Sequence, residues 1–507
     1  MSNRMSSAMA HLWQRIKGGR SQRYELLPLT EKDELKYRKH HSTGLRRAAV
    51  YLVALIALLL LGFHGFFRSA AVPTANKSCD TIDDGYRCSP RTSHFWGQYS
   101  LWFSVPSDIH VDPPEHCDVS FASVLSRHGG RDPTMSKTLL YGATVGLIQN
   151  TSTAFPDEFA FLKDYEYNLG ADLLTDAGRQ EMVNSGAHFY RRYKDFLKGK
   201  TPFVRSSGQA RVVESANKWL EGYAQAAHKM TGAIDVSIPE AAGVNNTLSH
   251  DICTKFEDGP SSDLGDKAQD VWLAKFVPPV QARVNGKLGT NLSTTEIIHL
   301  MDLCPFTTLA SPTAQMSDFC HLFTEDEWQQ YDYYESLGKW YGYGNGNPLG
   351  PTQGIGYVSE LLARLTEEAV QVVGSINSTL DEDPATFPLH RKVYADFSHD
   401  NDMTGVLAAL GLYNNTKALS KSTVESTKKI KGYSAAWTVP FAARIYVEKL
   451  SCDRAKEEFV RIIVNDRVQA LDFCGGDEHG RCTLSKFVES QSFTRSGGQW
   501  DQCFASS

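Results

Sequence analysis

Two arginines flank one histidine at Arg127, His128 and Arg131, directly after a short run of β-prone residues. The planar, permanently charged guanidinium group matches the geometry of phosphate. An imidazole nitrogen can attack phosphorus, and a covalent intermediate divides one difficult displacement into two easier ones. This stretch therefore indicates an enzyme that acts on a phosphate or sulfate ester.

Two further stretches carry polar residues that suit the same chemistry. Arg205 follows the mostly apolar run 201–204, and His399 and Asp400 follow the mostly apolar run 393–397. His399 can add a positive donor, and a protonated Asp400 can give a proton to the leaving alcohol. Because an ordinary Asp has a pKa of about 3.9, the enzyme should prefer acid conditions unless burial raises that value. The chemistry requires no metal and no cofactor.

Each of these stretches has the form of a strand, a polar turn and then apolar residues at helical spacing. This pattern is typical of an α/β fold, in which ligands gather beyond the carboxyl ends of the strands. We therefore expect a central mixed sheet flanked by helices. Its core is predicted at about 110–136, 200–270 and 390–507. A mostly helical inserted domain is predicted at about 137–199 and 271–389.

The first 47 residues contain eleven Lys or Arg and four acidic residues, and they predict a cytoplasmic basic tail. Residues 48–67 contain no Asp, Glu, Lys or Arg and have the length of one transmembrane helix. The basic residues before this run place the amino terminus in the cytoplasm. Secretory signals normally lie within about the first 30 residues, so this run starts too late to be one. We expect a signal anchor, with residues 69–507 as a lumenal or extracellular body that cleavage would release; a buried soluble helix is the alternative.

All ten cysteines lie beyond this apolar run, which suits an oxidising compartment. None forms a C-x-x-C pair, which argues against a structural zinc site. The body is acidic, which argues against a general nucleic-acid-binding surface. Six glycosylation sequons also lie beyond the run, at Asn76, Asn150, Asn245, Asn291, Asn377 and Asn414.

The pattern Arg127-His128-Gly-x-Arg131-x-Pro133, with a distant His399-Asp400, resembles the histidine acid phosphatases. Other stretches are similar to the secreted fungal phytases within that family: 79–86, 96–99, 159–163, 169–172, 345–354, 394–401 and 436–442. The similarity runs from about residue 79 to 504 and leaves out the tail and the apolar run.

The resemblance implies hydrolysis of phosphomonoesters through a phosphohistidine, with phytate (myo-inositol hexakisphosphate) as the expected substrate at acid pH. His128 would be the nucleophile and Asp400 the proton donor. The phosphate would be held by Arg127, Arg131, Arg205 and His399. The inositol phosphate would also contact Gln98, Tyr99, Thr134 and Lys339. The resemblance pairs the cysteines as Cys79 with Cys88, Cys117 with Cys452, Cys253 with Cys503, Cys304 with Cys320, and Cys474 with Cys482.

Three positions depart from the phytase pattern. Asp132 stands where Tyr is common, Gly130 where Ala is usual, and Gly338 replaces one of two neighbouring Lys residues. A carboxylate beside the phosphate cluster should repel a polyphosphorylated ring, so Asp132→Tyr should improve the use of phytate more than that of small esters. The alternatives are a broad-specificity acid phosphatase and an inactive, membrane-anchored binding protein of the same fold.

Overall fold

The computed structural model describes residues 81–311 and 315–504. The expected tail, the expected anchor over residues 48–67, Asn76 and Cys79 lie outside the described residues. Within the described ranges, no helix combines the length and the apolar character needed to cross a membrane. The chain divides into two units, Met1–Asn76 and Lys77–Ser507, and the fold below belongs to the second.

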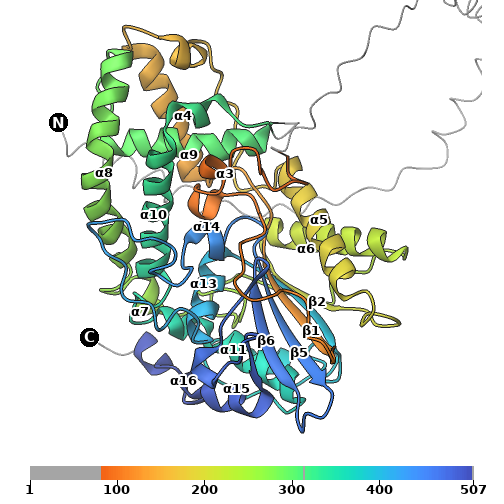
Figure 1. The fold of residues 1–507 in the computed structure, drawn as a ribbon. Coiled ribbons are helices and arrows are strands. Elements are labelled where there is room, and N and C mark those ends of the chain that lie inside the picture. The colour runs from red at the N-terminus through yellow and green to blue at the C-terminus, as the bar shows by residue number, and fades with distance from the viewer. Residues whose placement is uncertain (1–80, 312–314, 505–507) are drawn as a thin grey trace, which may run out of the picture. The chain divides into compact units, whose positions relative to one another are not determined.

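One eight-stranded sheet forms the centre of the described residues (Figure 1). Its strands are β1 Cys117–Arg127, β2 Phe203–Ser207, β3 Val236–Ile238, β4 Val393–Ser398, β5 Arg444–Cys452, β6 Phe459–Val464, β7 Arg467–Val468 and β8 Arg481–Thr483. The order is β3-β2-β4-β1-β5-β6-β7, and β8 also pairs with β6. The strands from β3 to β1 are parallel, whereas β5 to β8 pair antiparallel. The predicted mixed sheet is confirmed.

The described residues also form long helices, short helices and 3-10 turns. The longer helices are α4 Met135–Thr151, α5 Asp176–Tyr193, α6 Ala210–Ala227, α8 Leu264–Leu288, α9 Thr294–Ala310, α10 Glu325–Gly342, α11 Gly350–Thr366 and α13 Asp400–Ala409. The short helices are α3 Pro90–Ser93, α7 Thr254–Glu257, α12 Ser378–Asp381, α14 Ala435–Thr438, α15 Leu484–Ser490 and α16 Ser492–Arg495. The 3-10 turns are Gly97–Tyr99, Asp157–Lys163, Asp318–Leu322, Asp472–Cys474 and Trp500–Cys503.

The two faces of β1 belong to two different apolar clusters, because successive side chains of a strand point to opposite sides. Val124 packs with Trp219 of α6 and Phe189 of α5. Phe121 and Leu125 pack in the larger cluster, which contains residues of α11 and α13 and extends into α8, α9 and α10. Figure 1 shows α5 and α6 on one side of the sheet and α11 and α13 on the other. Helix α5 thus covers the sheet, although its residues fall within the range predicted for the helical insert.

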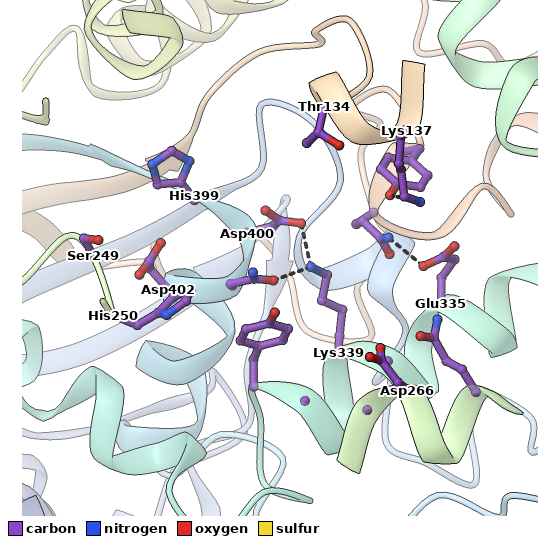
Figure 2. Close-up of a pocket in the computed structure, with 18 of the residues that line it drawn as sticks. Thr134, Lys137, Ser249, His250, Asp266, Glu335, Lys339, His399, Asp400 and Asp402 are labelled. Atoms are coloured by element: carbon purple, nitrogen blue, oxygen red, sulfur yellow. Dashed lines mark hydrogen bonds and ion pairs between the residues drawn. The ribbon is translucent and has the colours of Figure 1, made fainter. Parts of the chain in front are cut away.

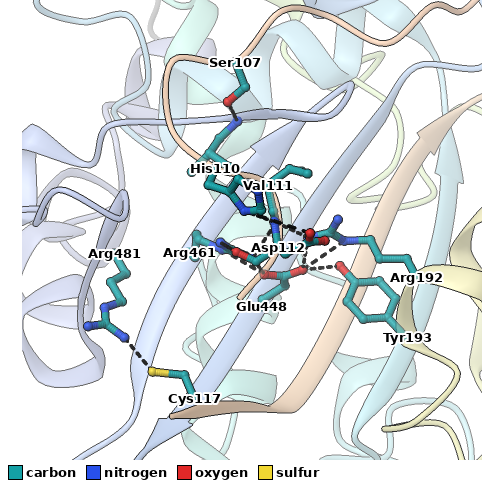
Figure 3. Close-up of polar contacts among 11 residues, drawn as sticks. Ser107, His110, Val111, Asp112, Cys117, Arg192, Tyr193, Glu448, Arg461 and Arg481 are labelled. Carbon is teal, nitrogen blue, oxygen red and sulfur yellow. Dashed lines mark hydrogen bonds and ion pairs between the residues drawn. The ribbon is translucent and has the colours of Figure 1, made fainter. Parts of the chain in front are cut away.

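A buried carboxylate on β5 ties an irregular segment to the sheet (Figure 3). Glu448 accepts hydrogen bonds from Arg192 at 2.9 Å, Tyr193 at 2.6 Å and Arg461 at 2.7 Å. Arg192 and Arg461 also donate to the carbonyl of Val111, at 2.8 and 3.0 Å. The same charged group therefore fixes α5, β6 and the chain that leads into β1.

Four of the predicted disulfides are confirmed: Cys117–Cys452, Cys253–Cys503, Cys304–Cys320 and Cys474–Cys482. Cys88 is also disulfide-bonded, and its predicted partner lies outside the described residues. Among the predicted glycosylation sites, Asn150, Asn245, Asn291 and Asn414 are exposed and Asn377 is partly exposed. Their glycosylation stays a prediction.

Candidate active site

The histidines of two predicted stretches meet at neighbouring strand ends. β1 ends at Arg127 and β4 ends at Ser398, and these residues are partners in the parallel register. His128 and His399 follow them directly, and their ring centroids lie 5.5 Å apart. The prediction that the carboxyl ends of the strands bring these side chains together is confirmed.

The His128 ring is held in one tautomer. It is 1% exposed, and its Nδ1 lies 2.8 Å from the carbonyl oxygen of Gly129. Because a carbonyl oxygen only accepts, Nδ1 carries the hydrogen and Nε2 keeps a free lone pair. Burial, together with the positive charges of Arg127 and Arg211, holds the pKa of His128 well below its ordinary value. The neutral imidazole with a free Nε2 is the form that can act as a nucleophile in acid.

The turn after His128 is fixed by α5, α6 and α9. The N–H of Gly129 donates to Ser215 Oγ at 3.1 Å, and the N–H of Gly130 donates to Glu181 Oε2 at 2.9 Å. A Cβ at Gly130 would lie 2.4 Å from Leu309 Cδ2. An alanine at this position would force Leu309 to move, so Leu309 accounts for the glycine that departs from the phytase pattern.

A cavity of about 680 Å³ opens beside this turn (Figure 2). Its lining includes several predicted site residues: Gln98, Tyr99, Arg131, Thr134, Lys339, His399 and Asp400. Its cationic side chains are Arg131, Lys137, Arg211 and Lys339. Its carboxylates are Glu240, Asp251, Asp266, Glu335, Asp400 and Asp402. The cavity is therefore mixed in charge, with more acidic than permanently cationic side chains.

Arg127 is buried next to this lining and contacts several residues around it. Its Nη1 donates to the carbonyl of Gln98 and, at 2.8 Å, to that of Val439. Its guanidinium lies 4.3 Å from the centroid of the Phe441 ring. Its Nη2 lies 3.4 Å from Asp400 Oδ2. Arg127 thus links the first predicted stretch to the carboxylate of the third.

Asp400 is surrounded by positive charge. Lys339 Nζ lies 2.6 Å from Asp400 Oδ2 and 2.5 Å from Asn401 Oδ1. Burial alone would raise the pKa of Asp400, but Arg127 and Lys339 outweigh it and hold that pKa well below its ordinary value. With these neighbours Asp400 is ionised even in acid, so it can hold a proton only when additional negative charge lies beside it.

The predicted role of Arg205 is wrong. Its side chain is 1% exposed and does not line the cavity. Its Nε lies 2.7 Å from Asp396 and its Nη2 lies 2.5 Å from Glu360, and Arg364 also pairs with Asp396 at 2.5 Å. Arg205 therefore belongs to a buried ion cluster between the sheet and α11, where its guanidinium already pairs with two carboxylates.

Arg211, on the first turn of α6, lines the cavity in the place predicted for Arg205. Burial, together with the charge of Arg131, lowers its pKa to about 10, because the two guanidinium groups face the same space. Its nearest carboxylate is Asp172, at 3.6 Å. One signal in the sequence pointed to it: an Arg in the first turn of a helix opposes the helix dipole, and such a cost suggests a function.

Asp132 does not line the cavity, which argues against the predicted repulsion of the substrate by this residue. Its carboxylate turns to the backbone of Gly170 and accepts a hydrogen bond there. Arg131 donates to the carbonyl of Asp132 at 2.8 Å, and its own side chain faces the cavity. Gly338 does line the cavity, and a Cβ at this position would lie 2.8 Å from Gln269 Cδ.

Several lining groups change charge between neutral and acid pH. Burial raises the pKa of Glu335 to about 7, although Glu335 accepts a hydrogen bond from Gln98 at 2.6 Å. Burial likewise raises the pKa of Asp402 to about 6. His399 Nε2 lies 2.8 Å from Glu240, which holds the ring at the cavity wall. The lining therefore becomes less negative as the pH falls.

Known proteins that resemble this chain are similar to it across nearly all of its described residues. The model of the histidine phosphatase superfamily (branch 2) matches residues 118–465. Phytase A of Aspergillus fumigatus is 49% identical over 468 residues, which cover 90% of this chain and 100% of that protein. Phytase A of Aspergillus oryzae is 49% identical over 442 residues, which cover 85% of this chain and 94% of that protein.

Two solved structures share the fold at low sequence identity. The phytase from D. castellii aligns with a TM-score of 0.66 and 21% identity, over 82% of this chain and 87% of that one. The multiple inositol polyphosphate phosphatase of Bifidobacterium longum, in complex with inositol hexasulfate, aligns with a TM-score of 0.51 and 13% identity. That alignment covers 78% of this chain and 97% of the other.

Proposed function

This chain belongs to the histidine phosphatase superfamily (branch 2), and we propose that it removes phosphate groups from phytate at acid pH. The observation that carries the proposal is the pair of adjacent strand ends. They place a neutral, buried His128, with a free Nε2, beside His399, and His399 and Asp400 line a cavity that also holds Arg131 and Arg211. The relatives named phytase A support phytate as the substrate.

In the first step we assign attack on phosphorus to Nε2 of His128. The new N–P bond forms as the P–O bond to the alcohol breaks, and Asp400 gives its proton to the leaving oxygen. Arg127, Arg131, Arg211 and His399 would hold the phosphoryl oxygens, since guanidinium donors match their geometry. In the second step water attacks the phosphohistidine, Asp400 takes the proton of the water, and phosphate leaves His128.

Substrate binding would allow Asp400 to take up the proton that it later donates. A phosphate group bound among Arg127, Arg131 and Arg211 brings negative charge next to the carboxylate and draws on the same cations. Both effects raise the pKa of Asp400, which Arg127 and Lys339 otherwise keep low. The carboxylate would then be protonated when the leaving oxygen needs a proton.

The test is turnover of p-nitrophenyl phosphate near pH 5 by the intact protein and by its His128→Ala variant. The intact protein should hydrolyse many molecules of p-nitrophenyl phosphate per molecule of enzyme, and the variant should lose nearly all activity. Equal rates would refute the assignment of the nucleophile. A higher kcat/KM for phytate than for simple monoesters would support phytate as the main substrate, and the reverse order would contradict it.

A second candidate function, a broad-specificity acid phosphatase, is favoured by one observation. The cavity lining contains six carboxylates and four Lys or Arg side chains. Such a lining attracts a polyanion less strongly than a purely cationic one, and it tolerates substrates with a single phosphate group. The comparison of phytate with simple monoesters separates the two candidates.

We also propose that residues 48–67 anchor the body to a membrane with the amino terminus in the cytoplasm. The support is the length and composition of this run and the basic residues before it. Fractionation of cells that produce the full chain tests it, together with amino-terminal sequencing of the product. A soluble product that begins near residue 70 would contradict a lasting anchor.

A further inference from the structure

Asp402 places a carboxylate in the cavity that the proposed reaction does not use. It is the third residue of α13, two positions after Asp400, and it is 7% exposed. It lines the cavity, and no donor among the described residues reaches its buried Oδ1. Leaving a buried acceptor without a donor is costly, so this oxygen is suited to a donor that arrives with the ligand.

The surroundings of Asp402 set its charge. The neighbouring His250 and His399 lower the pKa of Asp402, and the neighbouring Asp251 and Glu240 raise it. Burial is the largest influence and raises the pKa of Asp402 to about 6. Glu257 lies 2.7 Å from His250 Nδ1.

Burial by itself would lower the pKa of His250, but Asp402 and Glu257 outweigh it and raise that pKa to about 9. His250 thus stays charged while Asp402 titrates. Figure 2 shows His250, Asp402 and His399 on the same side of the cavity, away from Lys137 and Glu335.

We propose that Asp402, flanked by His250, forms a subsite for the group next to the scissile phosphate, and that it selects a hydroxyl there at neutral pH and accepts a phosphate only in acid. The proposal rests on the phosphatase function proposed above. When ionised, Asp402 accepts a hydrogen bond from a hydroxyl and repels a phosphate. When protonated, Asp402 can donate, and the charge of His250 then attracts the phosphate. Partly dephosphorylated inositol phosphates, which carry free hydroxyls, are the ligands that fit the ionised form.

The first test uses myo-inositol hexakissulfate as a competitive inhibitor, because its sulfate groups keep their charge between pH 5 and 7. The inhibition constant of the wild-type protein should rise with pH across this range, since Asp402 becomes an anion. In Asp402→Asn the rise of the inhibition constant from pH 5 to 7 should be smaller by a factor of about three or more, because the amide stays neutral. Equal pH dependence in the two proteins would overturn the proposal.

Two matched variants separate a subsite from a general effect of charge. Asp132→Asn makes the same chemical change close to the turn after His128 but outside the cavity. Asp266→Asn removes a carboxylate of α8 that lines the cavity. Both should change the pH dependence of inhibition less than Asp402→Asn does. An equal effect of either control would overturn the proposal.

The second test compares substrates at pH 7. Asp402→Asn should raise the ratio of kcat/KM for phytate to that for myo-inositol 1-phosphate, because it weakens repulsion of a neighbouring phosphate and also weakens acceptance of a neighbouring hydroxyl. General damage would lower both values together, and an unchanged ratio would overturn the proposal. Asp402→Ser serves if the amide variant fails to fold, as judged by its melting temperature. If the wild-type protein hydrolyses no ester, the phosphatase function fails, and calorimetry with the hexakissulfate still tests the subsite.

Discussion

Exchange of Arg205 or Arg211 for Gln should have opposite consequences, although the two residues lie only six positions apart. Arg211 lines the cavity, and loss of one donor to a transferred phosphoryl group should lower kcat/KM by about 10²–10³-fold. Its charge lies near that of Arg131, which opposes it. Arg211→Gln should therefore leave the free energy of unfolding unchanged or slightly higher.

Arg205→Gln should destabilise the fold and spare the chemistry. The change leaves Glu360 and Asp396 buried with one cation fewer, although Arg364 still pairs with Asp396. Breaking a buried ion pair in this way typically costs about 3–5 kcal/mol. The folded variant should keep kcat/KM within about tenfold of the wild-type value, since the side chain does not reach the cavity.

The two effects are measured separately. Initial rates with p-nitrophenyl phosphate near pH 5 give kcat/KM, and urea unfolding at 25 °C gives the free energy of unfolding. If Arg205→Gln lost about 100-fold in kcat/KM with an unchanged unfolding curve, Arg205 would belong to the phosphate site after all. If Arg211→Gln kept full activity, our placement of Arg211 in that site would be refuted.

Three further predictions concern the site and the core. Asp400→Asn should reduce kcat for an alkyl phosphate more than for p-nitrophenyl phosphate, because p-nitrophenolate leaves without a proton; equal losses would argue against Asp400 as the donor. Asp132→Tyr should leave the ratio of kcat/KM for phytate and p-nitrophenyl phosphate unchanged, since Asp132 faces Gly170, and a rise would restore a role in substrate choice. Burial opposes ionisation of Glu448, but Arg192 and Arg461 hold its pKa below the ordinary value. The ionised Glu448 therefore stabilises the fold above about pH 4.5, and this stabilisation is lost in stronger acid. Between pH 5 and 3 the free energy of unfolding should therefore fall more in the wild-type protein than in Glu448→Gln.

The sequence was sufficient for the parts of the site that follow a strand directly. The end of β1 and the end of β4 each show an apolar run followed by charged residues, and parallel strands bring such ends to one edge. The register of Arg127 with Ser398 makes His128 and His399 neighbours. Nothing in the local pattern shows which strands are adjacent, but a site at one sheet edge requires only that both strands be parallel.

Arg205 could not be placed from its own surroundings in the chain. It lies within β2, where side chains stand perpendicular to the sheet, and its register partner Asp396 is far away in sequence. An Arg inside a strand can be a ligand contact or a buried ion pair, and only the long-range partners Asp396 and Glu360 decide between these.

The orientation of Asp132 follows from that of Arg131. Neighbouring side chains in an extended segment point to opposite sides, so two adjacent residues cannot both face one cavity. Arg131 forms an isolated antiparallel bridge with Leu174, which shows that the chain is extended here. Once Arg131 is assigned to the phosphate, Asp132 must face the other way, toward Gly170.

The preference for acid expected from the sequence was attributed to Asp400, but the charges around the cavity point to other carboxylates. Arg127 and Lys339 keep the pKa of Asp400 low, so the approach to pH 5 does not protonate it. The groups that gain protons on that approach are Glu335 and Asp402, whose pKa values burial raises to about 7 and about 6. Each proton removes one negative charge from the lining while the four Lys and Arg charges stay. Acid conditions should thus act mainly on the binding of a polyanionic substrate, and the pH dependence of KM should exceed that of kcat.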